Sequence, residues 1–247
     1  MRAEEVTGVV LAGGQSTRMG RDKALLPIAG KPLVRHLAER MAALGIRRLI
    51  VACGTEARGR EYGALLQGLA GADEIVTAAD AYPGSGPLAG LHAALGAVPE
   101  RGYAFVMACD MPTVSVGLFA RLLQAAEGGG AQSGAEAEGF GLADASLRPS
   151  IGAGGPMDGE AAGQAASAAE QGAIPQVVLT PGQPFHALYH ASAVHVLARR
   201  LEQGDLRLMS LLGELRTTVI ALSEAEEAAF VNLNTPELYE RFERRGE

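Results

Sequence analysis

The chain has 247 residues, of which 48% are hydrophobic and 20% are charged, and its formal net charge at pH 7 is -7. This length and apolar content are enough for a full core in one large domain or two small ones. The acidic balance, with no block of Lys and Arg and no Trp, argues against a nucleic-acid surface, which needs a cationic face to displace counterions. A small anionic ligand is still compatible with this charge, because a local basic cluster can exist in an acidic protein.

The sequence also carries no sign of a membrane or a secretory location. No apolar run reaches the roughly 18 residues that a membrane span needs. The first residues, MRAEEVTG, are acidic where a signal peptide would be basic and then apolar. We therefore expect a cytoplasmic protein that does not associate with a membrane.

The two cysteines, Cys53 and Cys109, each fall at the end of an expected strand and show no CxxC spacing. This pattern predicts neither a disulfide framework nor a zinc site. Both thiols are expected to be reduced and to lie in the core.

Short runs rich in Val and Ile alternate along the chain with segments of helical period. The expected strands are residues 6–12, 47–53, 74–78, 103–109, 176–180 and 217–222. Between the first two, the stretch KPLVRHLAERMAALG predicts a helix with Pro32 in its first turn and Gly45 at its end. Repetition of this unit predicts an α/β fold: a doubly wound, mostly parallel sheet with helices on both faces and ligands at the carboxyl ends of the strands.

Residues 127–173 interrupt this alternation. Roughly half of them are Gly or Ala, and no period survives, so the segment has too little apolar area to offset its ordering entropy. We expect a single domain over residues 1–247 with a disordered or loosely ordered insertion at about 127–173. An Ala-rich helix over residues 160–171 is the alternative.

A glycine-rich loop follows the first expected strand, in the stretch VVLAGGQSTRMGRDKALL. Its spacing matches neither GxGxxG, because Gly13 and Gly14 are adjacent, nor GxxxxGK[ST], because Gly20 is not followed by Lys. Glycines directly after a buried strand let backbone N–H groups approach phosphate oxygens or a base, and Arg18 and Lys23 add the positive charge that a triphosphate requires. The loop therefore predicts a nucleotide site; a solvated turn with surface charges is the alternative.

This stretch, followed by GKPL at residues 30–33, resembles the signature of the molybdenum cofactor guanylyltransferases and their MobA-like nucleotidyltransferase relatives. Further matching motifs occur in order: Asp80 before YPGSGPLAG, Asp110 in VMACDMP, GDLR at 204–207 and VNLNTPEL at 231–238. The resemblance covers the chain except for the insertion and residues 54–73. It implies a Rossmann-like nucleotidyltransferase domain.

The resemblance also implies roles for individual residues. Arg18, Lys23 and Asp110 are implied to be catalytic, and Asp110 at the end of a central strand is suited to hold Mg²⁺, which prefers one or two carboxylates plus phosphate oxygens and waters. Arg207, Asn232 and Asn234 are implied to bind the acceptor, since Arg meets a phosphate and Asn both donates and accepts. The residues implied to contact the nucleotide are Leu11, Ala12, Gly13, Gly14, Lys23, Asp80 and Asp110.

Each of these assignments has a simpler alternative. Asp110 could cap a helix before Pro112, Asp80 could be an ordinary turn acid, Asn234 could cap the last helix, and Arg207, which we expect on a helix, could form a surface salt bridge. The histidines, by contrast, form no HExxH pattern. They are expected to be surface or packed residues: His36, His92, His186, His190 and His195.

The implied reaction is Mg²⁺-dependent transfer of GMP from GTP to molybdopterin or its molybdenum-loaded form, with release of pyrophosphate. We also expect transient contacts with other proteins of cofactor biosynthesis or with target proteins. The chain departs from the family at the end of the second expected strand, where Ala52-Cys53-Gly54 stand in place of a common Asn. The alternatives are therefore a molybdopterin cytidylyltransferase, a sugar-phosphate nucleotidyltransferase of the same fold, or a non-catalytic nucleotide-binding regulatory protein.

Overall fold

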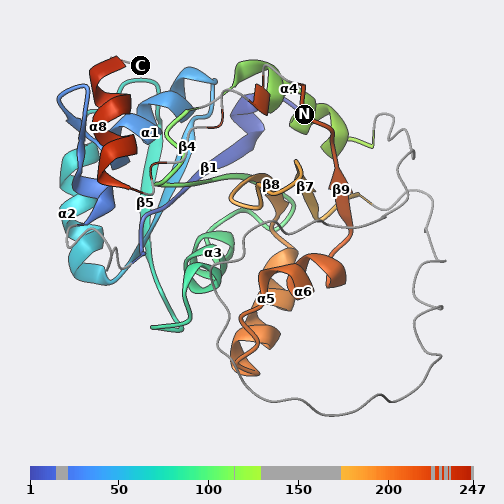
Figure 1. The fold of residues 1–247 in the computed structure, drawn as a ribbon. Helices are drawn as coiled ribbons and strands as arrows, with labels where there is room; N and C mark the ends of the chain where they lie inside the picture. The colour runs from blue at the N-terminus through green and yellow to red at the C-terminus, as the bar shows by residue number, and fades with distance from the viewer. Residues whose placement is uncertain are drawn as a thin grey trace, which may run out of the picture. The chain divides into compact units, whose positions relative to one another are not determined.

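The computed structural model describes residues 1–14, 22–113, 115–128, 174–223, 226–227, 230, 233 and 235–245, which all belong to one compact unit. Seven strands form its main sheet: β1 (Val6–Leu11), β4 (Arg48–Gly54), β5 (Glu74–Ala79), β6 (Tyr103–Ala108), β7 (Val177–Leu179), β8 (His186–His190) and β9 (Thr217–Val219). Their order is β5-β4-β1-β6-β8-β7-β9, and β8 runs antiparallel to both of its neighbours (Figure 1). A small hairpin pairs β2 (Pro27–Ile28) with β3 (Lys31–Pro32). The predicted α/β fold with a mostly parallel sheet is confirmed.

The helices cover both faces of this sheet, as predicted. They are α1 (Leu33–Ala43), α2 (Glu56–Leu66), α3 (Pro87–Gly96), α4 (Val116–Ala126), α5 (Ala193–Glu202), α6 (Leu208–Glu214) and α8 (Pro236–Arg245). Successive strand residues point to opposite faces, so Val10 packs in a core with α1, α2, α4 and α8, whereas Val9 packs in a second core with α3, α5 and α6. Figure 1 shows α3, α5 and α6 together on the side of the sheet away from α1 and α4.

The sequence located six of the seven strands of the main sheet and helix α1, but not the β2–β3 hairpin or the bounds of helices α2 to α5. Helix α1 begins one residue after Pro32, and the chain leaves it at Gly45, whose φ of +92° suits glycine. Strand β8 was missed because its sequence, HALYH, begins and ends with polar residues. Both of its histidines are nevertheless buried.

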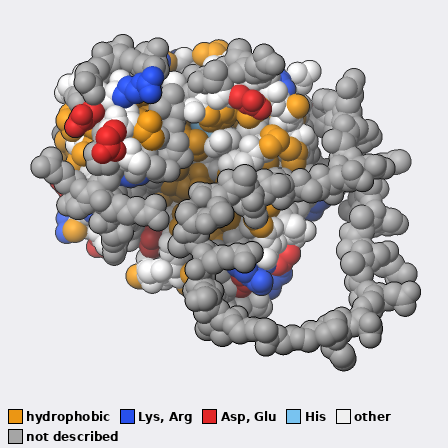
Figure 2. Space-filling model, viewed as in Figure 1, with side chains coloured by type: hydrophobic (Ala, Val, Ile, Leu, Met, Phe, Trp, Pro, Cys, Tyr) orange, Lys and Arg blue, Asp and Glu red, His pale blue; other side chains and the backbone are white. Residues whose placement is uncertain are grey.

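Of the predicted insertion at 127–173, the structure describes only Glu127 and Gly128, which form a turn after α4. Residues 129–173 lie outside the described part, so the insertion stays a prediction. Among the residues that are described, no helix is both long and apolar enough to span a bilayer. On the face that Figure 2 displays, the acidic and basic side chains of the described residues are interspersed.

Candidate active site

A cleft of about 890 Å³ lies at the carboxyl ends of β1, β4, β5 and β6. Its volume is within the range of small-molecule sites, and its place at the strand ends is where open α/β sheets bind ligands. The lining residues are Leu11, Ala12, Gly13, Gly14, Asp22, Lys23, Ala24, Gly54, Thr55, Arg58, Asp80, Pro83, Gly84, Gly86, Pro87, Gly90, Ala108, Cys109, Asp110 and Phe185.

This cleft brings together all seven residues that were predicted to contact the nucleotide: Leu11, Ala12, Gly13, Gly14, Lys23, Asp80 and Asp110. They come from three strand ends and from the turn at Lys23, so residues up to 99 positions apart meet at one edge of the sheet. Three other predicted site residues, Arg18, Asn232 and Asn234, lie outside the described residues.

The two adjacent glycines have different structural reasons. A Cβ on Gly13 would lie 3.0 Å from the backbone nitrogen of Gly54 and 3.1 Å from its Cα, so the ends of β1 and β4 pass too closely for a side chain there. Gly54 itself has a φ of +75°, a conformation that favours glycine. A Cβ on Gly14 would meet no described atom within 4 Å. Packing thus requires Gly13, whereas no described atom crowds the position of a side chain at Gly14.

Asp80 lines the cleft directly after β5. Its Oδ1 is buried and has no hydrogen-bond partner among the described residues. Burial raises the pKa of this carboxyl above its ordinary value. A buried carboxylate oxygen without a partner destabilises the empty protein, which favours a role in ligand binding over that of an ordinary turn acid.

Asp110 follows β6 at the same edge of the cleft. Its backbone carbonyl accepts a hydrogen bond of 2.7 Å from the N–H of Leu233, which is itself buried. Leu233 belongs to the motif VNLNTPEL, so this bond fixes one residue of the predicted acceptor motif beside Asp110. The same strand end places Cys109 in the core, where burial raises the pKa of its thiol to about 12. Cys53 is also buried, and both cysteines are free, as predicted.

Three polar residues of the cleft were not identified from the sequence: Asp22, Thr55 and Arg58. Thr55 caps α2, where its hydroxyl oxygen accepts from the N–H of Arg58 at 3.4 Å. Arg58 and Tyr62 both contact Asp22 from α2. Residues 54–73 were outside the family resemblance. The only signal in the sequence for this part of the site was the pair Arg58 and Tyr62, two polar residues spaced four apart after the end of a strand.

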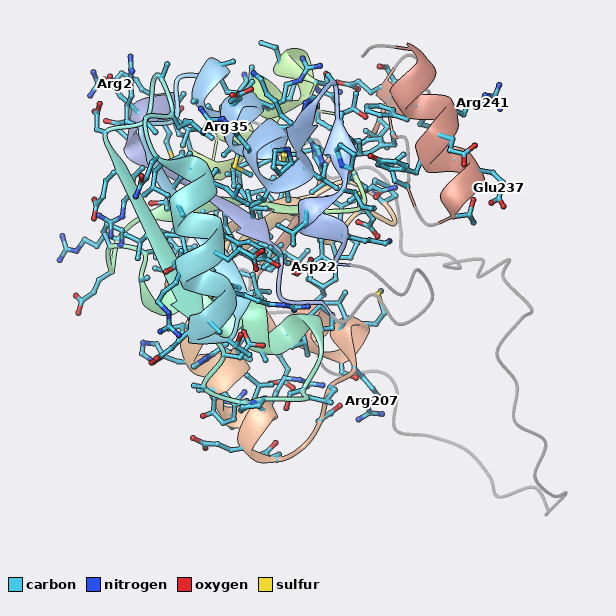
Figure 3. All side chains as sticks on the ribbon, turned by 90° about the vertical axis from the view of Figure 1, so that its left-hand side faces the viewer. Arg2, Asp22, Arg35, Arg207, Glu237 and Arg241 are labelled. Carbon is cyan, nitrogen blue, oxygen red and sulfur yellow. The ribbon has the colours of Figure 1, made fainter. Side chains whose placement is uncertain are left out.

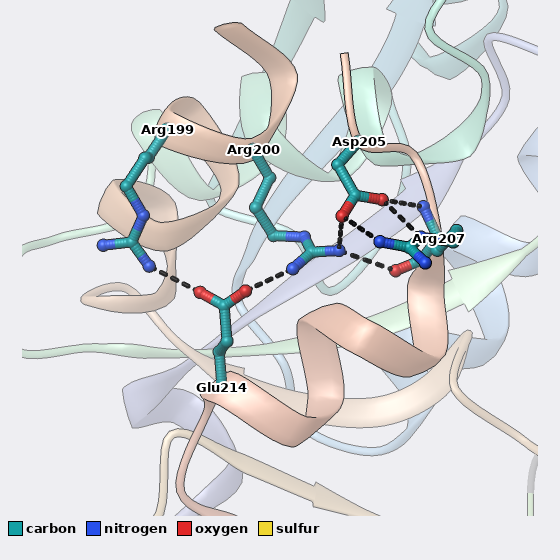
Figure 4. A network of polar contacts seen from close by, with 5 residues as sticks. All are labelled: Arg199, Arg200, Asp205, Arg207 and Glu214. Atoms are coloured by element: carbon teal, nitrogen blue, oxygen red, sulfur yellow. Dashed lines mark hydrogen bonds and ion pairs between the residues drawn. The ribbon is translucent and has the colours of Figure 1, made fainter. Parts of the chain in front are cut away.

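Arg207 lies outside the lining of this cleft. It caps the start of α6 and is not within a helix as predicted, because Asp205 binds both its backbone N–H, at 3.2 Å, and its guanidinium, through two bonds of 2.9 Å. Figure 4 shows Asp205 shared with the buried Arg200, which also pairs with Glu214. The guanidinium of Arg207 holds the pKa of Asp205 well below its usual range. In Figure 3, Arg207 is clearly separated from Asp22.

The histidines take packing and surface positions, as expected. His186 is buried between the rings of Phe105 and Phe230, with centroid distances of 5.3 and 5.0 Å, and burial lowers its pKa to about 4. His195 is exposed on α5. Within the described part of the chain, no group of three or more His, Cys, Asp or Glu side chains is arranged to hold a metal.

Comparison with known proteins gives a consistent family. Residues 8–219 match the family described as "MobA-like NTP transferase domain". A molybdenum cofactor guanylyltransferase of Vibrio cholerae serotype O1 is 28% identical over 98% of this chain and 93% of its own length. A probable molybdenum cofactor guanylyltransferase of Natronomonas pharaonis is 33% identical over 98% of both chains.

Solved structures agree on the fold. The structure of molybdopterin-guanine dinucleotide biosynthesis protein A from Archaeoglobus fulgidus matches with a TM-score of 0.65 and 21% identity, over 97% of this chain and 98% of that one. A 4-diphosphocytidyl-2C-methyl-D-erythritolsynthase from Anaerococcus prevotii matches with a TM-score of 0.59 and 9% identity, over 98% of each chain. At these identities the likeness concerns architecture alone.

Proposed function

Because this chain belongs to the family of MobA-like NTP transferase domains, we propose that it transfers GMP from GTP to molybdopterin or its molybdenum-loaded form. The names of its full-length relatives support this choice of nucleotide and acceptor. The observation that carries the proposal is the cleft in which Gly14, Lys23, Asp80 and Asp110 meet at the strand ends. These groups are what a nucleoside triphosphate requires.

The proposed chemistry needs little from the protein in proton transfer. A phosphate oxygen of the acceptor attacks the α-phosphorus of GTP, a new O–P bond forms, and the bond from that phosphorus to the bridging oxygen breaks. Pyrophosphate leaves with the electron pair. Since the acceptor phosphate is ionised at pH 7, alignment and charge neutralisation suffice.

Different residues of the site are proposed to align the phosphates and to neutralise their charge. The backbone at Gly13 and Gly14 can approach phosphate oxygens closely. Lys23 lines the same cleft and brings a positive charge to the triphosphate, and we propose the same contribution for Arg18. These charges meet the phosphates both before and during transfer.

The carboxylates fit a divalent cation. Mg²⁺ takes one or two carboxylates and completes its shell with phosphate oxygens and waters, and the Oδ1 of Asp80, which has no hydrogen-bond partner among the described residues, supports such a role. We propose that Asp110 would hold Mg²⁺, with Asp80 as a second carboxylate on the same cleft. When bound, Mg²⁺ supplies neutralisation of charge on the phosphates.

The acceptor is proposed to lie on the C-terminal side of Asp110. The hydrogen bond from Leu233 to the Asp110 carbonyl supports this placement, because Asn232 and Asn234 flank Leu233 in the sequence. Arg207 is proposed to bind the acceptor phosphate. Its guanidinium would donate to the phosphate while its bonds to Asp205 keep the guanidinium oriented. We also propose a cytoplasmic location and transient contacts with other proteins of cofactor biosynthesis or with target proteins.

A second candidate is transfer of a different nucleotide. The end of β4 carries Ala52-Cys53-Gly54, and Gly54 lies against Gly13 without room for a side chain, so the end of this strand offers no side-chain amide to select guanine. A molybdopterin cytidylyltransferase is the alternative that this observation favours.

The test is to incubate the purified protein with Mg²⁺, molybdopterin and each NTP in turn and to follow pyrophosphate release. Release with GTP that depends on the acceptor is the expected result. Preference for CTP would select the alternative, and no release with any NTP would contradict nucleotidyl transfer.

A further inference from the structure

Helix α2 sends two side chains to the loop that joins β1 to the turn η2 (Lys23–Leu25). Arg58 Nη1 donates to the carbonyl oxygen of Gly13 at 3.2 Å, and its Nε lies 3.3 Å from Oδ2 of Asp22. The hydroxyl of Tyr62 donates to the same Asp22 oxygen at 2.6 Å. Residues four apart share one face of a helix, so α2 presents both groups to this loop.

Asp22 is the far end of the loop, and its carboxylate is fully engaged. Besides Arg58 and Tyr62 at Oδ2, its Oδ1 accepts from the N–H of Ala24 at 3.0 Å and so caps the turn that contains Lys23. Tyr62 is fully buried and the side chain of Asp22 is 15% exposed. The position of Asp22, which Figure 3 labels, therefore fixes the position of the turn that contains Lys23.

Gly13 is the near end of the loop. A trans peptide points the carbonyl of one residue and the N–H of the next in opposite directions. With the Gly13 carbonyl bound to Arg58, the N–H of Gly14 is directed away from that guanidinium. No described atom lies within 4 Å of where a Cβ on Gly14 would be, which leaves room for a ligand beside this residue.

We propose that Arg58 is a positioning residue for the nucleotide: its guanidinium fastens Gly13 at one end of the loop and Asp22 at the other. This contact holds the N–H of Gly14 and the backbone of Lys23 in place before a triphosphate binds. Two adjacent glycines are costly to order, and ordering them in advance lowers the cost of binding. The inference rests on the proposed function only in taking the ligand to be a nucleoside triphosphate.

A guanidinium suits this task because it has several donors in a fixed plane and stays charged. Lys would have to reach a carbonyl and a carboxylate from a single nitrogen. Arg60, on the same helix but exposed, offers a matched control for the loss of one positive charge.

The experiment compares Arg58→Met, Arg58→Lys and Arg60→Met with the unmodified protein. The first measurement is the Kd of Mg-GTP and of Mg-CTP, without any acceptor. The second is the hydrogen-exchange rate of the Ala24 amide without nucleotide, which reports the position of Asp22. Arg58→Met should raise the Kd of the preferred nucleotide about tenfold and accelerate exchange at Ala24, Arg58→Lys should restore part of both, and Arg60→Met should change neither.

Three results would overturn the inference: unchanged binding in Arg58→Met, an equal loss in Arg60→Met, or weaker binding with unchanged exchange at Ala24. The last would mean that Arg58 meets the nucleotide directly. A protein that binds GTP normally but transfers nothing to molybdopterin would contradict the proposed function and leave this inference standing, because neither measurement uses the acceptor.

Discussion

Replacing Asp80 by Asn should stabilise the empty protein while removing its response to nucleotide. The carboxylate has a buried oxygen without a partner among the described residues, and burial raises its pKa. A neutral amide of the same shape removes the charge from this position. We expect a gain of about 1 kcal/mol in the free energy of unfolding from loss of the desolvated charge alone, because the amide keeps a polar atom in the same buried position. For a domain of this size that is a rise in Tm of about 2–4 °C.

The pH dependence of this difference has a definite sign. A carboxyl whose pKa is raised by folding destabilises the folded state when it is charged, and this penalty disappears as the pH falls and the group takes up a proton. The advantage of Asp80→Asn over the unmodified protein should therefore shrink on acidification from pH 7. Asp73→Asn is the matched control, because Asp73 is exposed, and its Tm should not change.

With bound nucleotide, the unmodified protein should have a higher Tm than Asp80→Asn, the reverse of the order expected without nucleotide. A ligand at about 100 times its Kd stabilises the unmodified protein by about 2.7 kcal/mol, which raises Tm by about 5–10 °C. Asp80→Asn should show little of this rise with Mg-GTP. The assay is thermal unfolding in metal-free buffer and again with saturating Mg-GTP. A lower Tm for the empty variant together with an undiminished response to Mg-GTP would show that Asp80 is structural and refute this reasoning.

Three further predictions follow from the other residues. Asp110→Asn should keep its Tm but lose at least about 10²-fold in turnover, the scale of one electrostatic stabiliser; near-normal turnover at saturating Mg²⁺ would count against it as a metal ligand. Arg207→Ala should raise the acceptor concentration for half-maximal rate about tenfold, about 1.4 kcal/mol, while the Kd of GTP stays constant; equal weakening of both would move the acceptor elsewhere. Folding lowers the pKa of His186 to about 4, so on acidification the unfolded state takes up this proton before the folded state does. The free energy of unfolding should therefore decrease as the pH is lowered from about 6.5 to 4. His186→Met should lose part of that slope in urea unfolding, and an unchanged slope would contradict the assignment.

The sequence alone predicted six strands of the sheet and the glycine loop that lines one side of the cleft, because both follow from patterns of neighbouring residues. Central strands buried on both faces appear as runs of Val and Ile, and the glycine loop with Lys23 is continuous in the chain. Asp110 could be placed because it lies two residues after the central strand β6, whereas Asp80, which follows the edge strand β5, was placed by the motif YPGSGPLAG that comes after it. The carboxyl ends of parallel strands lie at one edge of a sheet, so the sequence places these two residues close together.

The features that sequence reasoning missed depend on contacts between distant residues. Arg58 meets Gly13 and Tyr62 meets Asp22 across 45 and 40 positions, and no local period records such a pair. Strand β8 escaped because the aromatic rings that bury His186 come from other elements. Arg207 was expected on a helix, and its bonds to Asp205 instead hold it in an extended conformation before α6.

The central claim, transfer of a nucleotidyl group to a molybdopterin acceptor, is tested most directly by following the phosphorus atoms of GTP. The protein would be incubated with Mg²⁺, molybdopterin and GTP labelled either at the α- or at the γ-phosphorus. The α-label should appear in the molybdopterin product and the γ-label in pyrophosphate, in equal amounts and only when the acceptor is present. Recovery of the γ-label in inorganic phosphate or in the molybdopterin product, with the α-label remaining in GDP, would contradict nucleotidyl transfer.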